Sequence, residues 1–245
     1  MICHLPLLAV CALVGCAPMS IAATPNPLEQ SPRAPVSRSV AFNRCIDKSA
    51  PPSWKHPPHK FCTVQWSKLG SRGHAVLYRA RYQWPSDEGI DYSPPPPDPP
   101  HYLAVTEVLF EGTDKGTVVT PLFALQEDET YSFLRPLTFH KVGGRSLVEI
   151  LICLNGTGGC GQDFLSWRSD NLHALKNETR AQIDKWLAPG YSTLKAPQID
   201  IDSLSGQSGG WLKTDPNCCP SRTVEFSIAL LPNEIRVKHP HFVTD

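Results

Sequence analysis

Apolar and polar residues alternate in short runs along much of the chain between residues 60 and 170, and glycine, proline and asparagine separate the runs. A two-residue period is typical of β-strands, because successive side chains point to opposite faces of a sheet. His74–Trp84 shows this period clearly. Val76, Tyr78, Ala80 and Tyr82 fall on one side, and Leu77, Arg79, Arg81 and Gln83 fall on the other. The pattern predicts a half-buried strand.

A nearly continuous apolar run lies at Leu147–Leu154 and is rich in β-branched residues. Such a run predicts a strand that is buried on both faces. Asn155-Gly156 is a strong turn dipeptide, and further glycines follow it. We therefore expect a hairpin that returns toward Trp167, with the other strands arranged around it.

Further strand-like runs precede and follow this hairpin. They are Lys60–Trp66, Tyr102–Glu111, Thr117–Leu125, Thr130–His140, Thr223–Leu231 and Glu234–Lys238. Pro121 indicates an edge or a bulge, because proline cannot donate to a β-ladder. Residues 191–215 are expected to be mostly loop, with short strands at Gln198–Asp202 and Gly210–Leu212. Strands joined by short turns predict a mainly β fold, an antiparallel meander that forms a sandwich or an open barrel.

One segment, Asn177–Leu187, has a helical pattern. The residues on its apolar face are Thr179, Ile183, Trp186 and Leu187. Asn177 can cap its amino end, and Pro189-Gly190 ends it. We expect this one C-terminal helix to pack on the sheet.

The first residues predict export. The apolar run Leu5–Val14 is about ten residues long, which suits a signal-peptide core and is shorter than the roughly 20 residues of a membrane span. Leu13-Val14-Gly15-Cys16 resembles the bacterial lipoprotein box, in which Cys16 becomes lipid-modified. The alternative is ordinary cleavage near Ala23. The signal peptide is therefore expected to be residues 1–16, or 1–23 in the alternative.

The rest of the chain is expected to have two parts. Residues 17–40 are rich in proline, serine and threonine and predict a disordered tether. Residues 41–245 predict a single β-rich domain. If Cys16 is lipidated, Ala17 favours an outer-membrane lipoprotein that faces the periplasm, because inner-membrane retention uses an aspartate at that position. A soluble periplasmic or secreted form is the second choice.

The composition of the chain limits the classes of partner that it is expected to bind. The chain has 23 basic and 23 acidic residues and no basic stripe, which argues against a nucleic-acid partner. The expected contacts are therefore the membrane, through the lipid on Cys16, and an unidentified protein or small-molecule ligand. The proline run Pro94–Pro100 predicts a stiff surface segment of polyproline II.

Six cysteines remain after the leader: Cys45, Cys62, Cys153, Cys160, Cys218 and Cys219. An even number in an exported chain predicts disulfides. Proximity favours Cys45–Cys62 and Cys153–Cys160, which leaves the adjacent Cys218 and Cys219 to pair with each other. Because adjacent Cα atoms lie about 3.8 Å apart and a disulfide prefers about 5.5 Å, an exchange is an open alternative. In the exchange, Cys153 and Cys160 each take one of the pair.

Two patterns suggest chemistry. Gly206-Gln207-Ser208-Gly209-Gly210 matches the G-x-S-x-G motif of serine hydrolases, but no buried strand precedes it and no helix follows it. A flexible loop is the better interpretation of these residues. Cys218-Cys219 suggests a redox or metal-binding dithiol. No helical histidine pair or Cys-x-x-Cys spacing is present, so neither a metal nor another cofactor is predicted.

The C-terminal segment carries a resemblance. Trp186-Leu187-x-Pro189-Gly190 is followed by a lysine, by Asp215-Pro216-Asn217-Cys218-Cys219-Pro220-Ser221 and by an apolar strand. This arrangement resembles the C-terminal part of uncharacterised exported proteins, lipoproteins among them, of Gram-negative bacteria. The resemblance covers about the last 70 residues and implies no activity.

Together these patterns predict a disulfide-linked cell-envelope protein. No group of nucleophile, base and orienting residue stands out, so no catalytic residue is assigned and a non-enzymatic binding or structural module is favoured. The alternatives are an envelope serine hydrolase that uses Ser208 and a periplasmic thiol or metal-binding protein that uses Cys218 and Cys219.

Overall fold

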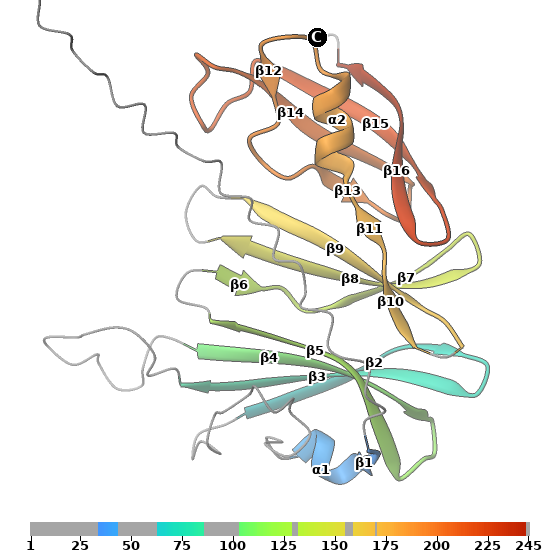
Figure 1. Ribbon diagram of the computed structural model, residues 1–245. Helices are drawn as coiled ribbons and strands as arrows, with labels where there is room; N and C mark the ends of the chain where they lie inside the picture. Colours follow the sequence, from blue (N-terminus) through green and yellow to red (C-terminus); the bar gives the residue numbers. More distant parts are fainter. Residues whose placement is uncertain are drawn as a thin grey trace, which may run out of the picture.

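The computed structural model describes residues 34–43, 63–85, 103–128, 132–154, 159–169 and 171–243. In these residues the chain forms three open β-sheets stacked in series, with two short helices (Figure 1). The pairing is antiparallel apart from one short parallel pair. The predicted mainly β, antiparallel fold is confirmed, and the sheets do not close into a barrel.

The first sheet, sheet A, has the strand order β1-β5-β4-β3-β2. Its elements are β1 (Val36–Ser37), β2 (Thr63–Arg72), β3 (Ala75–Pro85), β4 (Leu103–Thr113) and β5 (Val118–Asp128). Helix α1 (Arg38–Asn43) covers one face, where Ala41 and Phe42 join the apolar side chains of β3, β4 and β5. The pairing shifts between Leu109 and Phe110, opposite Phe123 and Pro121, so the bulge predicted at Pro121 is present.

Strand β3 differs from its prediction, because both of its faces are buried. Tyr78 faces α1, and Leu77 belongs to the core between sheets A and B. Arg79 and Arg81, which suggested a solvent face, lie beside the fully buried Glu107 of β4. A buried counter-charge produces the same polar alternation as exposure to water does, and sequence pattern does not separate the two.

Sheet B is the middle layer (Figure 1). It contains β6 (Ser132–Leu134), β7 (Thr138–Val142), β8 (Arg145–Leu154), β9 (Cys160–Trp167) and β10 (Leu172–Ala174). The predicted hairpin is confirmed as β8 and β9, and β8 is an interior strand. Val148 and Ile150 pack against sheet A, whereas Leu147 packs toward sheet C. The Cys153–Cys160 disulfide is confirmed; it joins directly opposite residues whose Cα atoms are 3.9 Å apart.

Sheet C forms the third layer. Its strands are β11 (Lys176–Asn177), β12 (Tyr191–Ser192), β13 (Gln198–Asp200), β14 (Ser205–Leu212), β15 (Arg222–Leu230) and β16 (Glu234–Phe242). The predicted helix is present as α2 (Thr179–Trp186), and Ile183 and Leu187 bury its apolar face against this sheet. Asn177 lies one residue before the cap position, Glu178, although its side-chain oxygen does accept the amide of Thr179 at 3.3 Å.

The glycine-rich residues 206–210 are not the expected loop but part of β14, which is paired with β13 and β15. Aromatic rings lie where side chains of these glycines would be. A Cβ on Gly206 would come within 2.5 Å of the Phe226 ring, and one on Gly209 within 2.1 Å of the Trp211 ring. These glycines are therefore required by close packing rather than by flexibility.

The predicted boundary at residue 40 between the tether and the domain is also corrected, because residues 36–40 already belong to a strand and a helix of the fold. Val36 pairs with Val119 of β5, and α1 starts at Arg38. Strand β1 has only two residues, but it pairs with β5. The local composition of this segment does not predict that pairing. Cys16, Cys45, Cys62 and Pro94–Pro100 lie outside the described residues. Neither of the described helices is long and apolar enough to cross a membrane.

Candidate binding site

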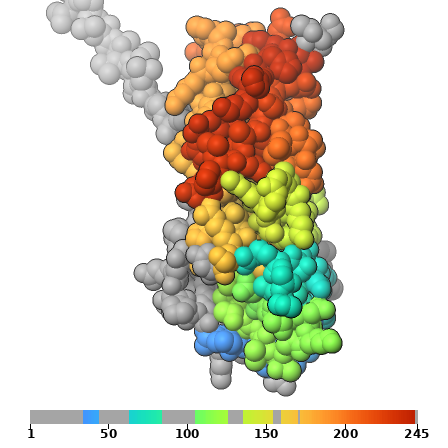
Figure 2. Space-filling model, turned by 90° about the vertical axis from the view of Figure 1, so that its right-hand side faces the viewer, coloured from blue at the N-terminus to red at the C-terminus, as the bar shows by residue number. Residues whose placement is uncertain are grey.

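A pocket of about 560 Å³ opens where the ends of the three sheets meet. Its walls come from the β2–β3 turn, the β7–β8 turn, the end of β9 and the turn between β15 and β16. Figure 2 faces this edge of the molecule, and the β15–β16, β7–β8 and β2–β3 hairpins lie there one beside the next. Sheets A, B and C therefore all contribute to one site.

We call this pocket the basic pocket, because all the charged side chains in its lining are positive. The cations are Arg72, Lys141, Arg145 and Arg168, and the polar neutral residues are Ser71, Ser146 and Ser166. No aspartate or glutamate is among the lining residues. In the described part of the chain, none of the four cations forms an ion pair with a carboxylate. The four cations of the pocket are therefore not neutralised by ion pairs with the described carboxylates.

Arg72 is held in place from two sides. Its Nη2 donates to the backbone oxygen of Arg168 at 2.6 Å, and its guanidinium lies 4.9 Å from the centre of the Trp167 ring. The Trp167 indole in turn donates to the Glu111 carboxylate at 2.7 Å. The Nε atom of Arg72 is buried and has no hydrogen-bond partner within the described residues. An unpaired buried donor is costly, so a partner from outside the chain would be favoured at this position.

Arg145 and Arg168 hold the turn of sheet C against sheet B. Arg145 Nη1 donates to Leu231 O at 2.5 Å, and Arg168 Nη2 donates to Pro232 O and, at 2.8 Å, to Asn233 Oδ1. A guanidinium has five N–H donors in a planar fork. These contacts therefore orient both side chains and still leave donors for a ligand.

Three further polar lining residues, Lys141, Ser146 and Ser166, have side chains without a hydrogen-bond partner among the described residues. Ser146 and Ser166 are buried residues whose hydroxyls form no hydrogen bond with the described residues. Lys141 pairs with Ser146 through the backbone, and its exposed side chain forms no hydrogen bond or ion pair with the described residues. Gly73 and Gly144 have φ of 59° and 76°, which allows tight turns at the rim. The cations and hydroxyls of the lining together can bind an anion by charge-assisted hydrogen bonds.

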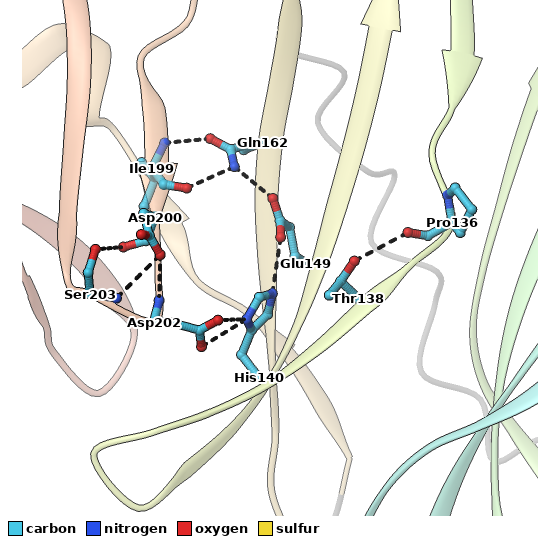
Figure 3. A network of polar contacts seen from close by, with 9 residues as sticks. All are labelled: Pro136, Thr138, His140, Glu149, Gln162, Ile199, Asp200, Asp202 and Ser203. Atoms are coloured by element: carbon cyan, nitrogen blue, oxygen red, sulfur yellow. Dashed lines mark hydrogen bonds and ion pairs between the residues drawn. The ribbon is translucent and has the colours of Figure 1, made fainter.

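A second polar cluster joins sheets B and C (Figure 3), and none of its residues lines the basic pocket. His140 Nε2 is 3.0 Å from Glu149 Oε2, and its Nδ1 is 3.0 Å from both oxygens of Asp202. Gln162 donates to Glu149 at 2.6 Å and exchanges two hydrogen bonds with the backbone of Ile199. Both imidazole nitrogens face carboxylates, so neither is available to activate a nucleophile. We interpret the cluster as a link between sheets.

The structure does not support the hydrolase motif geometrically. Ser208 lies inside β14, is 7% exposed and donates to the backbone oxygen of Gly209 at 3.3 Å. A strand continues on both sides of it, whereas a hydrolase serine needs a sharp turn between a strand and a helix. No contact joins Ser208 to a histidine within the described residues.

The predicted disulfides at Cys218 and Cys219 are absent, because both thiols are free and exposed. The Cys153–Cys160 bridge excludes the exchange in which each of those two cysteines takes one of the pair. Asp215 shapes their turn by accepting the amides of Leu212 and Ser221 and the Ser221 hydroxyl. A hydrogen bond with Cys218 raises the pKa of the Cys219 thiol. No group of three or more metal-ligating side chains occurs among the described residues.

No known protein family, curated protein or solved structure matches this chain. The resemblance of its C-terminal segment to uncharacterised exported proteins therefore stays a prediction.

Sequence reasoning missed the basic pocket because its residues belong to four separate turns. Arg72 and Pro232 are far apart along the chain, and each basic residue alone is typical of a solvated turn. One signal was present: Arg72-Gly73 and Gly144-Arg145 both place an arginine next to a glycine at a hairpin turn.

Proposed function

We propose that this protein is an exported, non-enzymatic binding module that holds an anionic ligand in the basic pocket. One observation carries the proposal: four cations line a single pocket without a carboxylate among the lining residues, although the net charge of the chain is zero. Concentrated charge of one sign raises the local concentration of the opposite ion and speeds its association. The pocket volume is within the usual range of small-molecule sites, roughly 300–1,000 Å³.

Binding is tested by comparing two variants that each remove one positive charge. Lys141→Gln changes an exposed lining residue whose side chain forms no hydrogen bond or ion pair with the described residues. Arg222→Gln changes an exposed residue at the start of β15, outside the pocket. In calorimetry with inorganic phosphate and pyrophosphate, we expect Lys141→Gln to weaken binding roughly fivefold and Arg222→Gln to leave it unchanged. Affinity should also fall as salt is added.

A pocket that binds neither anion at millimolar concentration in low salt would overturn the proposal. Equal weakening by Lys141→Gln and Arg222→Gln would also overturn it, because net charge rather than the pocket would then explain binding.

The export and anchoring part of the proposal rests on Leu13–Cys16 and is tested separately. The intact mass of the native mature protein should show acyl chains on a chain that starts at Cys16. A bare chain starting near Thr24 would contradict lipidation and leave the binding proposal standing.

A second candidate function is a thiol site, because Cys218 and Cys219 are both free and exposed on one turn. Alkylation of the folded protein with and without prior reduction counts its free thiols. Alkylation of both Cys218 and Cys219 without prior reduction would support this candidate. If neither cysteine is alkylated without reduction, the candidate is excluded.

A further inference from the structure

We infer that the ligand of the basic pocket is a saccharide carrying more than one phosphate group. This inference rests on the proposed function and adds to it the chemical class of the ligand. Three features of the pocket support this inference. They are the distribution of its cations, its size together with its neutral polar lining, and the burial of its one aromatic ring among the described lining residues.

The cations are distributed around the wall. Arg72 comes from the end of β2, Lys141 and Arg145 flank the β7–β8 turn, and Arg168 follows β9. Three of the four are arginines, whose planar forks match the oxygens of phosphate in bidentate pairs. Charges placed on separate elements suit a ligand with anionic groups at more than one position.

The pocket has more room and more neutral polar surface than a single oxyanion would use. Its volume of about 560 Å³ suits a molecule with a body as well as charged groups. Ser71, Ser146 and Ser166 provide hydroxyls that both donate and accept hydrogen bonds. Such a lining complements a body rich in hydroxyl groups.

A nucleotide ligand is disfavoured because the Trp167 ring is buried and covered. It is the single aromatic residue among the described lining residues, and it is only 2% exposed. The Arg72 guanidinium covers its ring at 4.9 Å. Bases are bound largely by stacking on aromatic faces, and the pocket has no open face for one.

The test uses the full mature protein and four probes in calorimetry: inorganic phosphate, pyrophosphate, adenosine diphosphate and fructose 1,6-bisphosphate. We expect fructose 1,6-bisphosphate to bind at least about tenfold more tightly than inorganic phosphate, because it engages cations on separate elements. Adenosine diphosphate should bind no more tightly than pyrophosphate. Lys141→Gln and Ser166→Ala should each weaken fructose 1,6-bisphosphate roughly threefold to tenfold, and Arg222→Gln should not.

The outcomes separate this inference from the proposed function. If phosphate binds and fructose 1,6-bisphosphate binds no more tightly, the inference of a saccharide ligand is wrong, whereas the proposed anion-binding function is still supported. If adenosine diphosphate binds well above pyrophosphate, the ligand is a nucleotide and the inference is overturned. If no probe binds, both the inference and the proposed function fail.

Discussion

At the scale of single residues, Glu107 determines a pH dependence that the sequence does not reveal. Its carboxyl group is fully buried between sheets A and B, and this burial raises its pKa from 4.5 to about 6 despite the nearby Arg79 and Arg81. The folded state therefore binds a proton more tightly than the unfolded state. Stability from this group is greatest below pH 4.5 and is lost as the pH rises through about 6.

Glu107→Gln removes this titration and isolates its effect. Denaturant unfolding of both proteins between pH 4.5 and 7 should show the difference in unfolding free energy shifting in favour of the variant as the pH rises. The shift should be about 2 kcal/mol across that range. A difference that stays constant with pH would show that Glu107 does not titrate in this window.

The close packing around the glycines of β14 leads to a second prediction, which concerns stability. A Cβ on Gly206 would meet the Phe226 ring at 2.5 Å and the backbone oxygen of Gln198 at 2.6 Å. Gly206→Ala should therefore destabilise the protein by roughly 1–3 kcal/mol, because both neighbours must move. Gly161→Ala in β9 is the matched control, since nothing lies within 4 Å of its Cβ position. Thermal unfolding that ranks the two variants equally would contradict the packing argument.

At the scale of elements, the Cys153–Cys160 disulfide closes the β8–β9 hairpin. The double change Cys153→Ser with Cys160→Ser should reduce the unfolding free energy by about 2.5 kcal/mol, from the loss of loop closure in the unfolded chain. Cys218→Ser with Cys219→Ser is the control and should have little effect, because both thiols are free and exposed. Comparable losses in the two variants would mean that the second pair is structural after all.

The link between sheets B and C allows another comparison of this kind. Glu149→Ala should destabilise by roughly 1–3 kcal/mol, because it removes a partner from both His140 and Gln162 in a half-buried position. Asp202→Asn should cost less than about 1 kcal/mol, because the Asp202 side chain is 66% exposed. Denaturant titrations measure both, and the reverse order would show that the outer carboxylate holds the layers together.

The elements differ in how far the sequence predicts them, and the reason is the range of the interactions that form them. The β8–β9 hairpin and α2 follow from residues close together in the chain, so local pattern finds them. Strand β14 has the composition of a loop, and Gly206 is explained by its close approach to the Phe226 ring and to the backbone oxygen of Gln198, both of which lie on other strands. The basic pocket combines turns from three sheets, and no local pattern contains it.

At the scale of the whole molecule, the basic pocket lies where the layers are joined. Arg72 connects sheet A to the end of β9, and Arg145 and Arg168 connect sheet B to the β15–β16 turn. A ligand that contacts cations from several elements would restrain all of these connections together. Binding should therefore stabilise the stacking of the sheets as well as fill the pocket.

Hydrogen exchange tests this effect at the level of single segments. With fructose 1,6-bisphosphate at about 100 times its Kd, the free energy of unfolding should rise by about 2.7 kcal/mol. Because turns open locally at lower cost than strands, the amides of Arg72, Gly73, Leu231, Asn233 and Glu234 should slow most. The pairing of β1 with β5 lies at the far side of sheet A and should be nearly unchanged. If protection instead appears only in the β7–β8 turn, the ligand contacts sheet B alone and does not join the layers.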